Sequence, residues 1–230
     1  MAVATAVNID GGRRQPEFKG GRKWRYDDRL AEEQQVGDKD EVYGLVTNLD
    51  RGHMVRREDP VWGSPEEAGR ANCETYILVN AVPQHSKLNR DMKSWRAVEE
   101  HIQREVARDH RLLSVFTGPI FSEGDPPVGK VLVPLDFWKV IVTVRSSAEL
   151  HATAFRFSQA QFLRREALEE VPSDSWLQRI RAQQKSVASI GTATGLDFGA
   201  LVDADSLARR ALVDEADPTV DLTLVEDIVL

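Results

Sequence analysis

Cysteine is almost absent from this sequence of 230 residues, and long apolar runs are missing altogether. The single Cys73 excludes an internal disulfide framework and a cysteine-based zinc cage. No run approaches the roughly 18 apolar residues that a membrane helix needs, so no membrane partner is expected. The first residues, MAVATAVNIDGG, lack the basic region and the apolar core of a signal peptide, which favours the cytoplasm for the chain as given.

Net positive charge, which would suit a protein that binds nucleic acid, is also lacking: the formal net charge is −7 at pH 7. Most of this negative charge lies near the end, because residues 203–227 hold eight acidic and two basic residues. Residues 13–29, in contrast, hold seven basic and three acidic residues, a net charge of +4. A local basic patch of this kind can steer a polyanion even when the whole molecule is negative.

The hydrophobic pattern predicts many strands and a few helices. Apolar, β-branched segments predict strands at residues 3–9, 42–47, 75–82, 112–118, 130–134, 136–144 and 150–157. A long amphipathic helix is predicted within residues 88–110, where apolar residues recur at spacings of three and four. Shorter helices are predicted at 158–169, 173–185 and 204–214.

These elements do not alternate regularly between strand and helix, which is typical of an α+β fold. We expect one domain over residues 1–200. Residues 201–230 are expected to form an acidic C-terminal helix and tail packed on the same domain. The last dozen residues, TVDLTLVEDIVL, suit either a docking strand or a mobile tail.

The stretch DRGHMVRREDPVWG, residues 50–63, surrounds a histidine with arginines. Cations near His53 would lower its pKa, so that it would be a neutral base at pH 7. The same cations, from Arg51, Arg56 and Arg57, would attract an anion. A neutral base beside an anion-binding patch indicates a site that cleaves phosphodiesters.

Such a site would need a hard divalent cation, because charge must be neutralised as the bond breaks. Magnesium keeps most of its waters and often takes only one or two protein oxygens. The sequence shows no carboxylate cluster of convincing spacing, so the amide oxygen of Asn89, at the start of the long predicted helix, is a candidate ligand.

Each of these residues also has a simpler explanation. A single histidine is more often a solvated side chain than a catalytic base. Arg56 and Arg57 are explained equally well as solvated surface, and Asn89 is explained as the N-cap of its helix.

Several ordered motifs favour the catalytic interpretation. They read RKWRYDDRL at 22–30, DRGH at 50–53, YILVNAVPQ at 76–84, LN at 88–89, WRAVE at 95–99, VFTGPIF at 115–121 and VPLDFWKVIV at 133–142. This set resembles the DNA/RNA non-specific endonuclease family over about residues 5–200. That family includes secreted bacterial nucleases and mitochondrial endonuclease G. The resemblance implies an α+β fold whose largely antiparallel central sheet is flanked by helices and carries a ββα-metal active-site motif.

The resemblance also implies roles for individual residues. His53 matches the general base, and Asn89 matches the protein ligand of Mg²⁺, for which Mn²⁺ could substitute. Arg51 and Arg22 match catalytic arginines, the second of them in contact with phosphate, and Glu99 matches a glutamate that organises the water shell of the metal.

Asn80 matches an asparagine that supports the geometry of the site, and we group it with Arg56 and Arg57 as expected substrate-binding residues. One departure from the family pattern is the spacing from Asn89 to Trp95, six residues where four are expected, which affects the assignment of Glu99.

The resemblance implies a metal-dependent endonuclease that cuts DNA and RNA with little sequence specificity and leaves 5′-phosphate ends. One alternative is an effector module that is inactive alone and is activated by a partner or by proteolysis. Another is a non-catalytic nucleic-acid-binding relic of the fold. A homodimer is implied by several family members, and an upstream domain by relatives with an extra stretch before a segment like TAVNIDG.

Overall fold

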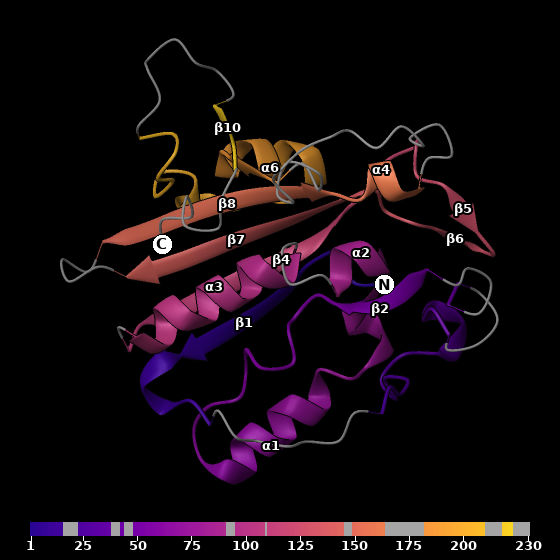
Figure 1. The fold of residues 1–230 in the computed structure, drawn as a ribbon, viewed down its shortest axis with the longest axis horizontal. Coiled ribbons are helices and arrows are strands. Elements are labelled where there is room, and N and C mark those ends of the chain that lie inside the picture. Colours follow the sequence, from indigo (N-terminus) through magenta and orange to yellow (C-terminus); the bar gives the residue numbers. More distant parts are fainter. Residues whose placement is uncertain are drawn as a thin grey trace.

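A computed structural model describes residues 1–15, 23–37, 42–43, 48–90, 95–108, 110–144, 149–163, 182–209 and 218–222. An antiparallel sheet forms the centre of this part of the chain, with strands in the order β1-β4-β7-β8-β9-β10 (Figure 1). These strands are β1 Thr5–Asp10, β4 Leu112–Ile120, β7 Asp136–Val144, β8 Leu150–Ser158, β9 Gln183–Lys185 and β10 Thr219–Asp221. The predicted α+β class with a largely antiparallel central sheet is confirmed.

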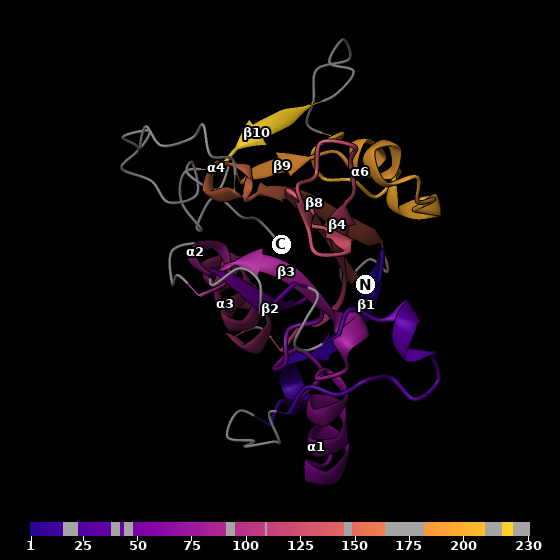
Figure 2. The ribbon, with the colours of Figure 1, turned by 90° about the vertical axis from the view of Figure 1, so that its right-hand side faces the viewer.

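Helices cover both faces of this sheet, on opposite sides of it (Figure 2). Helix α3 (Trp95–Arg108) packs its apolar stripe on one face, and α6 (Val187–Thr194) packs on the other. Strand β7 therefore buries both of its alternating sets of side chains, as a strand covered on both faces must. None of the described helices is long and apolar enough to cross a membrane.

A smaller unit lies on the α3 side of the sheet. Strand β2 (Leu49–His53) pairs antiparallel with β3 (Ala81–His85), separately from the central sheet, and the short helix α2 (Ser86–Asn89) follows β3 directly. The order β2, β3, α2 is the ββα arrangement that the resemblance predicts. Residues 54–80 connect β2 to β3 and include α1 (Pro65–Glu74), at the bottom of Figure 1.

The side chain of Gln159 attaches this unit to the central sheet. Gln159 is fully buried and follows β8. Its oxygen accepts a hydrogen bond from the backbone N–H of His85 (2.7 Å), and its nitrogen donates to the carbonyls of Pro83 (3.2 Å) and Pro134 (2.6 Å). Because a buried amide is stable only when its polar atoms are paired, these bonds fix β3 against the sheet.

The remaining elements are short. They are α4 Ala160–Leu163, β5 Pro127–Val128, β6 Val131–Leu132, and 3-10 helices at Gly11–Arg13, Glu32–Gln34, Leu78–Asn80 and Gly199–Leu201. Helix α1 begins with a capping box between Ser64 and Glu67, and α6 ends at Gly195, whose φ of 71° suits glycine.

The predicted strands that became β1, β4, β7 and β8 are confirmed. The strand predicted at 75–82 is wrong for its first part, because a turn and a 3-10 helix precede β3. The strand at 130–134 shortens to β6. Residues 42–43 form a bend and a turn rather than the start of a strand, and residues 44–47 lie outside the described residues.

The predicted long helix is present as α3, and residues 91–94 of its expected range are not described. Residues 183–185 of the helix predicted at 173–185 form strand β9 instead, because they pair with β8. Residues 204 and 206–209 are turns, Asp205 forms an isolated bridge with Ala152, and 219–221 form a strand of the sheet. The helical interpretation of the C-terminal region is therefore wrong where the structure describes it. Residue 182 is described and is not helical, and residues 164–169, 173–181 and 210–214 of the short predicted helices lie outside the described residues.

Candidate active site

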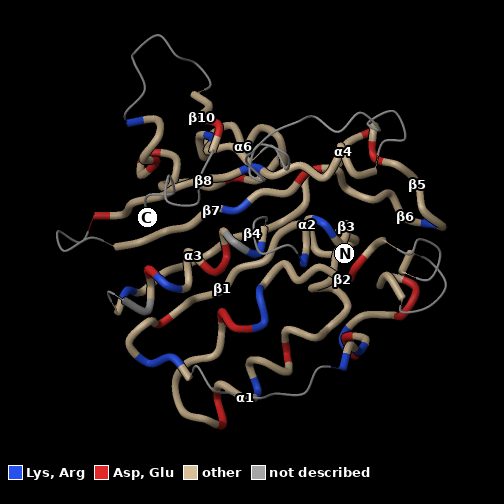
Figure 3. Tube along the Cα trace, in the orientation of Figure 1, with Lys and Arg blue, Asp and Glu red and all other residues tan. Residues whose placement is uncertain are grey.

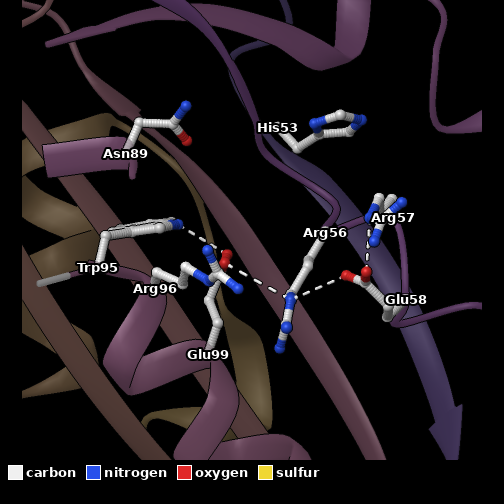
Figure 4. A pocket seen from close by; sticks show the side chains of 8 residues that line it. All are labelled: His53, Arg56, Arg57, Glu58, Asn89, Trp95, Arg96 and Glu99. Atoms are coloured by element: carbon white, nitrogen blue, oxygen red, sulfur yellow. Dashed lines mark hydrogen bonds and ion pairs between the residues drawn. The ribbon is translucent and has the colours of Figure 1, made fainter. Parts of the chain in front are cut away.

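A pocket of about 210 Å³ opens between the end of β2 and the start of α3. Five of the predicted site residues meet here although they lie on separate segments of the chain. The pocket is lined by His53, Arg56, Arg57, Glu58, Asn89, Trp95, Arg96 and Glu99 (Figure 4).

His53 is the last residue of β2, and aromatic rings enclose its imidazole. The ring of Trp24 lies 4.5 Å from it and that of Tyr76 lies 4.9 Å from it, the second nearly perpendicular. Its Nε2 atom is buried without a hydrogen-bond partner. Figure 4 shows the other ring nitrogen, Nδ1, on the side of the ring that faces Asn89. A base in this position would therefore act through Nδ1.

The pKa of His53 is lowered to about 4. Burial is the main cause, because a charged imidazolium loses its hydration there, and the positive charge of Arg57 adds to the effect. The sequence predicts the direction of this shift correctly but names only the arginines as its cause. The imidazole is thus neutral at pH 7 and able to accept a proton.

Asn89 is the last residue of α2, and not the N-cap of the long helix that the sequence suggests. Its Nδ2 donates to the Oδ2 atom of Asp50 (3.0 Å), and this bond fixes the rotation of the amide. Asp50 is held in turn by Arg90, whose Nε donates to the same oxygen (2.6 Å) and whose Nη2 donates to the other. The Asn89 oxygen is consequently directed into the pocket (Figure 4).

A single amide oxygen with open space around it suits Mg²⁺, which prefers hard oxygen ligands and retains several waters. Within the described residues, no three His, Cys, Asp or Glu side chains converge in a way that could hold a metal ion.

Gly52 is required by the packing of the β2–β3 pair. A Cβ atom at Gly52 would lie 2.1 Å from the Oε1 atom of Gln84, which is fully buried on the neighbouring strand. Any larger residue would have to displace the buried Gln84 side chain next to His53.

Glu99 lies at the base of the pocket, in a buried network of charges. It accepts a hydrogen bond from Trp95 Nε1 (2.6 Å) and lies 3.8 Å from Lys139 Nζ and 3.9 Å from Arg56 Nε. Burial raises the pKa of Glu99 to about 7, against the opposite influence of the charges on Lys139 and Arg56.

Lys139 lies beneath this glutamate, in the middle of β7, and is 1% exposed. Its ammonium donates to Thr117 Oγ1 (3.0 Å) and lies 4.7 Å from the ring centre of Trp95. Burial lowers the pKa of Lys139. Lys139 is not among the residues predicted for the site, although a lysine inside the apolar segment VPLDFWKVIV is a visible signal.

The two arginines expected to bind substrate are engaged with carboxylates. Arg56 Nε lies 3.1 Å from Glu58 Oε2, and its Nη2 lies 4.0 Å from Glu100 Oε1. Arg57 Nε lies 2.5 Å from Glu58 Oε1. The pocket therefore mixes both signs of charge, and Figure 3 shows basic and acidic positions interleaved along the layer that contains β2 and α3.

Two predicted residues, Arg51 and Asn80, lie outside the pocket lining, and a third is not described. The guanidinium of Arg51 lies over the ring of Tyr43, 4.9 Å from its centre. Asn80 is buried outside the pocket, with its amide bonded to the backbone of Val55 and Thr75, so it shapes the chain that follows β2. Arg22 is outside the described residues.

Residues 1–205 of the chain match the family model for DNA/RNA non-specific endonucleases. The chain belongs to this family. Members of the DNA/RNA non-specific endonuclease family depend on a metal.

Two curated relatives are similar to the chain. The uncharacterized protein y4fB of Sinorhizobium fredii is 37% identical over 165 residues, which are 70% of this chain and 25% of that protein. A protein of Nostoc sp. named nuclease is 29% identical over 153 residues, 66% of this chain and 51% of that protein. The match thus spans a quarter of one relative and about half of the other.

Among solved structures, the fold is similar to that of a chain in the crystal structure of the EndoG/EndoGI complex, in which EndoG is inhibited. The TM-score is 0.52 at 20% identity, with 85% of this chain and 77% of the other covered. This likeness supports the antiparallel sheet and its flanking helices as the fold of a DNA/RNA non-specific endonuclease.

Proposed function

We propose that the chain is a metal-dependent endonuclease that hydrolyses phosphodiester bonds of DNA and RNA with little sequence specificity and leaves 5′-phosphate ends. The observation that supports this most is one pocket in which a neutral imidazole faces an amide oxygen held in place by a carboxylate. The first group suits a general base, and the second suits a ligand for a hard cation.

In this mechanism His53 takes a proton from water through Nδ1, and the water attacks phosphorus in line with the departing 3′ oxygen. Mg²⁺ or Mn²⁺, when bound by Asn89, would supply stabilisation of the negative charge that develops as the bond breaks. Asp50 keeps the amide of Asn89 in the orientation that presents its oxygen.

Arginines would stabilise the phosphate oxygens in the transition state. Arg57 and Arg56 line the pocket, and Arg51 and Arg22 are proposed for the same purpose from the family pattern. Contacts of this kind reach the phosphate and not the bases, so little sequence specificity and strong salt dependence are expected. Glu99 and its buried partners would fix Trp95 and Arg56 at the base of the pocket.

The test is cleavage of supercoiled plasmid and of a structured RNA, with Mg²⁺ and with chelator. His53→Ala should lower the rate about 10²- to 10⁴-fold, the contribution of a general base. His110→Asn is a matched control, because His110 is exposed at a φ of 50°, which asparagine tolerates.

Cleavage that needs metal and is lost only in the first variant would establish the nuclease and assign its base. If the wild type binds these polymers but never cuts them, the free-standing enzyme is refuted. Fragment ends that accept a labelled phosphate without prior dephosphorylation would refute the 5′-phosphate product.

A further inference from the structure

Glu58 makes two ion pairs on one side of the pocket. Its two carboxylate oxygens go to different guanidinium groups: Oε2 lies 3.1 Å from Arg56 Nε, and Oε1 lies 2.5 Å from Arg57 Nε. Figure 4 shows the carboxylate between these two arginines. Within the described residues, these are the two ion pairs of its side chain, whose charge also acts on Arg14 and opposes the lowering of the Arg14 pKa by burial.

A carboxylate that spans two guanidinium groups offers them what a phosphodiester offers, namely two oxygens that share a negative charge. Glu58 therefore takes the place at Arg56 and Arg57 that a phosphate would need. The other acidic neighbours of Arg56 are farther away, with Glu99 at 3.9 Å and Glu100 at 4.0 Å.

The Glu58 side chain is exposed enough for a bound phosphate to displace it from the two arginines. Its side chain is 31% exposed and that of Arg57 is 37% exposed, whereas that of Arg56 is 16% exposed. An ion pair with the exposure of the Glu58–Arg57 pair contributes little free energy, because water competes for both charges. In contrast, Glu99 is buried under the pocket and bonded to Trp95, so it is not displaced in this way.

We propose that Glu58 is a built-in competitor for phosphate, which holds Arg56 and Arg57 until a phosphodiester displaces it. The inference rests on the proposed function and names the substrate class of the site. When a single phosphate replaces Glu58 at the two arginines, the free energy of binding gains little, because one anion is exchanged for another. A polymer makes further phosphate contacts outside the pocket, and these favour its binding. The pocket thus prefers polymeric nucleic acid to mononucleotides and free phosphate.

Binding is measured with chelator present, so that no cleavage is needed. The probes are a fluorescently labelled single-stranded 12-mer, followed by polarisation, and inorganic phosphate, which competes with it. Glu58→Gln keeps the shape of the side chain and removes its charge. It should bind both probes about 3- to 10-fold more tightly than wild type, the range expected for losing exposed ion pairs.

Two further variants separate competition from a general change in charge. Glu149→Gln removes the same charge from an exposed pair with Arg209, outside the pocket, and should change affinity less than about twofold. Glu58→Asp keeps the charge but is too short to reach both arginines at once. It should therefore also bind more tightly than wild type.

The proposal is overturned if Glu58→Gln matches Glu149→Gln, or if it binds more weakly, since Glu58 would then support the arginines. It is also overturned if Glu58→Gln still raises the affinity for the probes when Arg57→Gln is present in the same protein. Failure of the endonuclease is a separate result: no cleavage with Mg²⁺ in any variant, whatever the affinities measured in chelator.

Discussion

Lys139→Met tests the buried network beneath the pocket. Methionine keeps an unbranched stem of similar size, so the change mainly removes a charge. Lys139 is 1% exposed and lies 3.8 Å from Glu99, whose carboxylate would lose its nearest buried cation. Removing one partner of a buried ion pair is strongly destabilising only while the other partner remains ionised.

The size of the effect follows from the protonation of Glu99. Its pKa is raised from 4.5 to about 7, so below pH 7 the folded wild type already holds a proton there and needs no counter-charge. Above pH 7 the wild type ionises, whereas the variant keeps the proton to higher pH. Each pH unit over which the variant holds one extra proton lowers its relative free energy of unfolding by roughly 1.4 kcal/mol. We expect little difference at pH 6 and a loss of about 3 kcal/mol at pH 9.

Urea unfolding of both proteins at pH 6, 7, 8 and 9 measures this dependence. Lys185→Met is the control, because Lys185 lies in the short strand β9 and donates to Thr219. Its difference from wild type should not vary with pH. A Lys139→Met difference that is constant, or that is largest at pH 6, would refute the assignment of Lys139 as the counter-charge of Glu99.

Two further predictions concern the pocket. Arg57→Gln removes a charge that lowers the pKa of His53, so the acid limb of the pH profile of kcat/KM should move to higher pH. Arg96→Gln is the control and should leave the acid limb in place. Identical acid limbs in both variants would contradict the assignment. Asp50→Ala loses the acceptor that orients Asn89. Mg²⁺ or Mn²⁺ titrated into this variant without nucleic acid should bind about 10- to 100-fold more weakly than to the wild type, so unchanged affinity would exclude that role.

The central sheet could be predicted from the sequence because its long strands are buried on both faces. The segments that became β4, β7 and β8 are rich in apolar, aromatic and β-branched residues, a strong local signal. Strand β2 has no such signal. LDRGH is mostly polar, and it is extended because β3, far along the chain, pairs with it.

The apolar pattern at 75–82 was misleading for a similar reason. The amide of Asn80 bonds to the backbone of Val55 and Thr75, and these bonds favour a turn over the strand that the local composition suggests. Bonds to residues distant in sequence leave no local trace in the hydrophobic pattern.

Within the candidate site, the resemblance to the family, carried by its ordered motifs, was enough to bring His53 and Asn89 together, and both line one pocket. It did not reveal Asp50 as the partner of Asn89, because that contact depends on the strand register. Nor did it show that Glu58 forms ion pairs with both Arg56 and Arg57, since charged residues in a stretch such as RRED are usually solvated.

The segment between β2 and β3, residues 54–80, contains residues that shape the site and residues that can vary without affecting it. The strand pairing and the Asp50–Asn89 bond hold the base and the amide together from one side. Residues of the segment 54–80 that lie close to the site take part in it, because Tyr76 packs against the His53 ring and Arg56 and Arg57 line the pocket. Helix α1 contributes no residue to the pocket lining, so its exposed positions, such as Glu66 and Arg70, can change while the relative position of His53 and Asn89 is preserved.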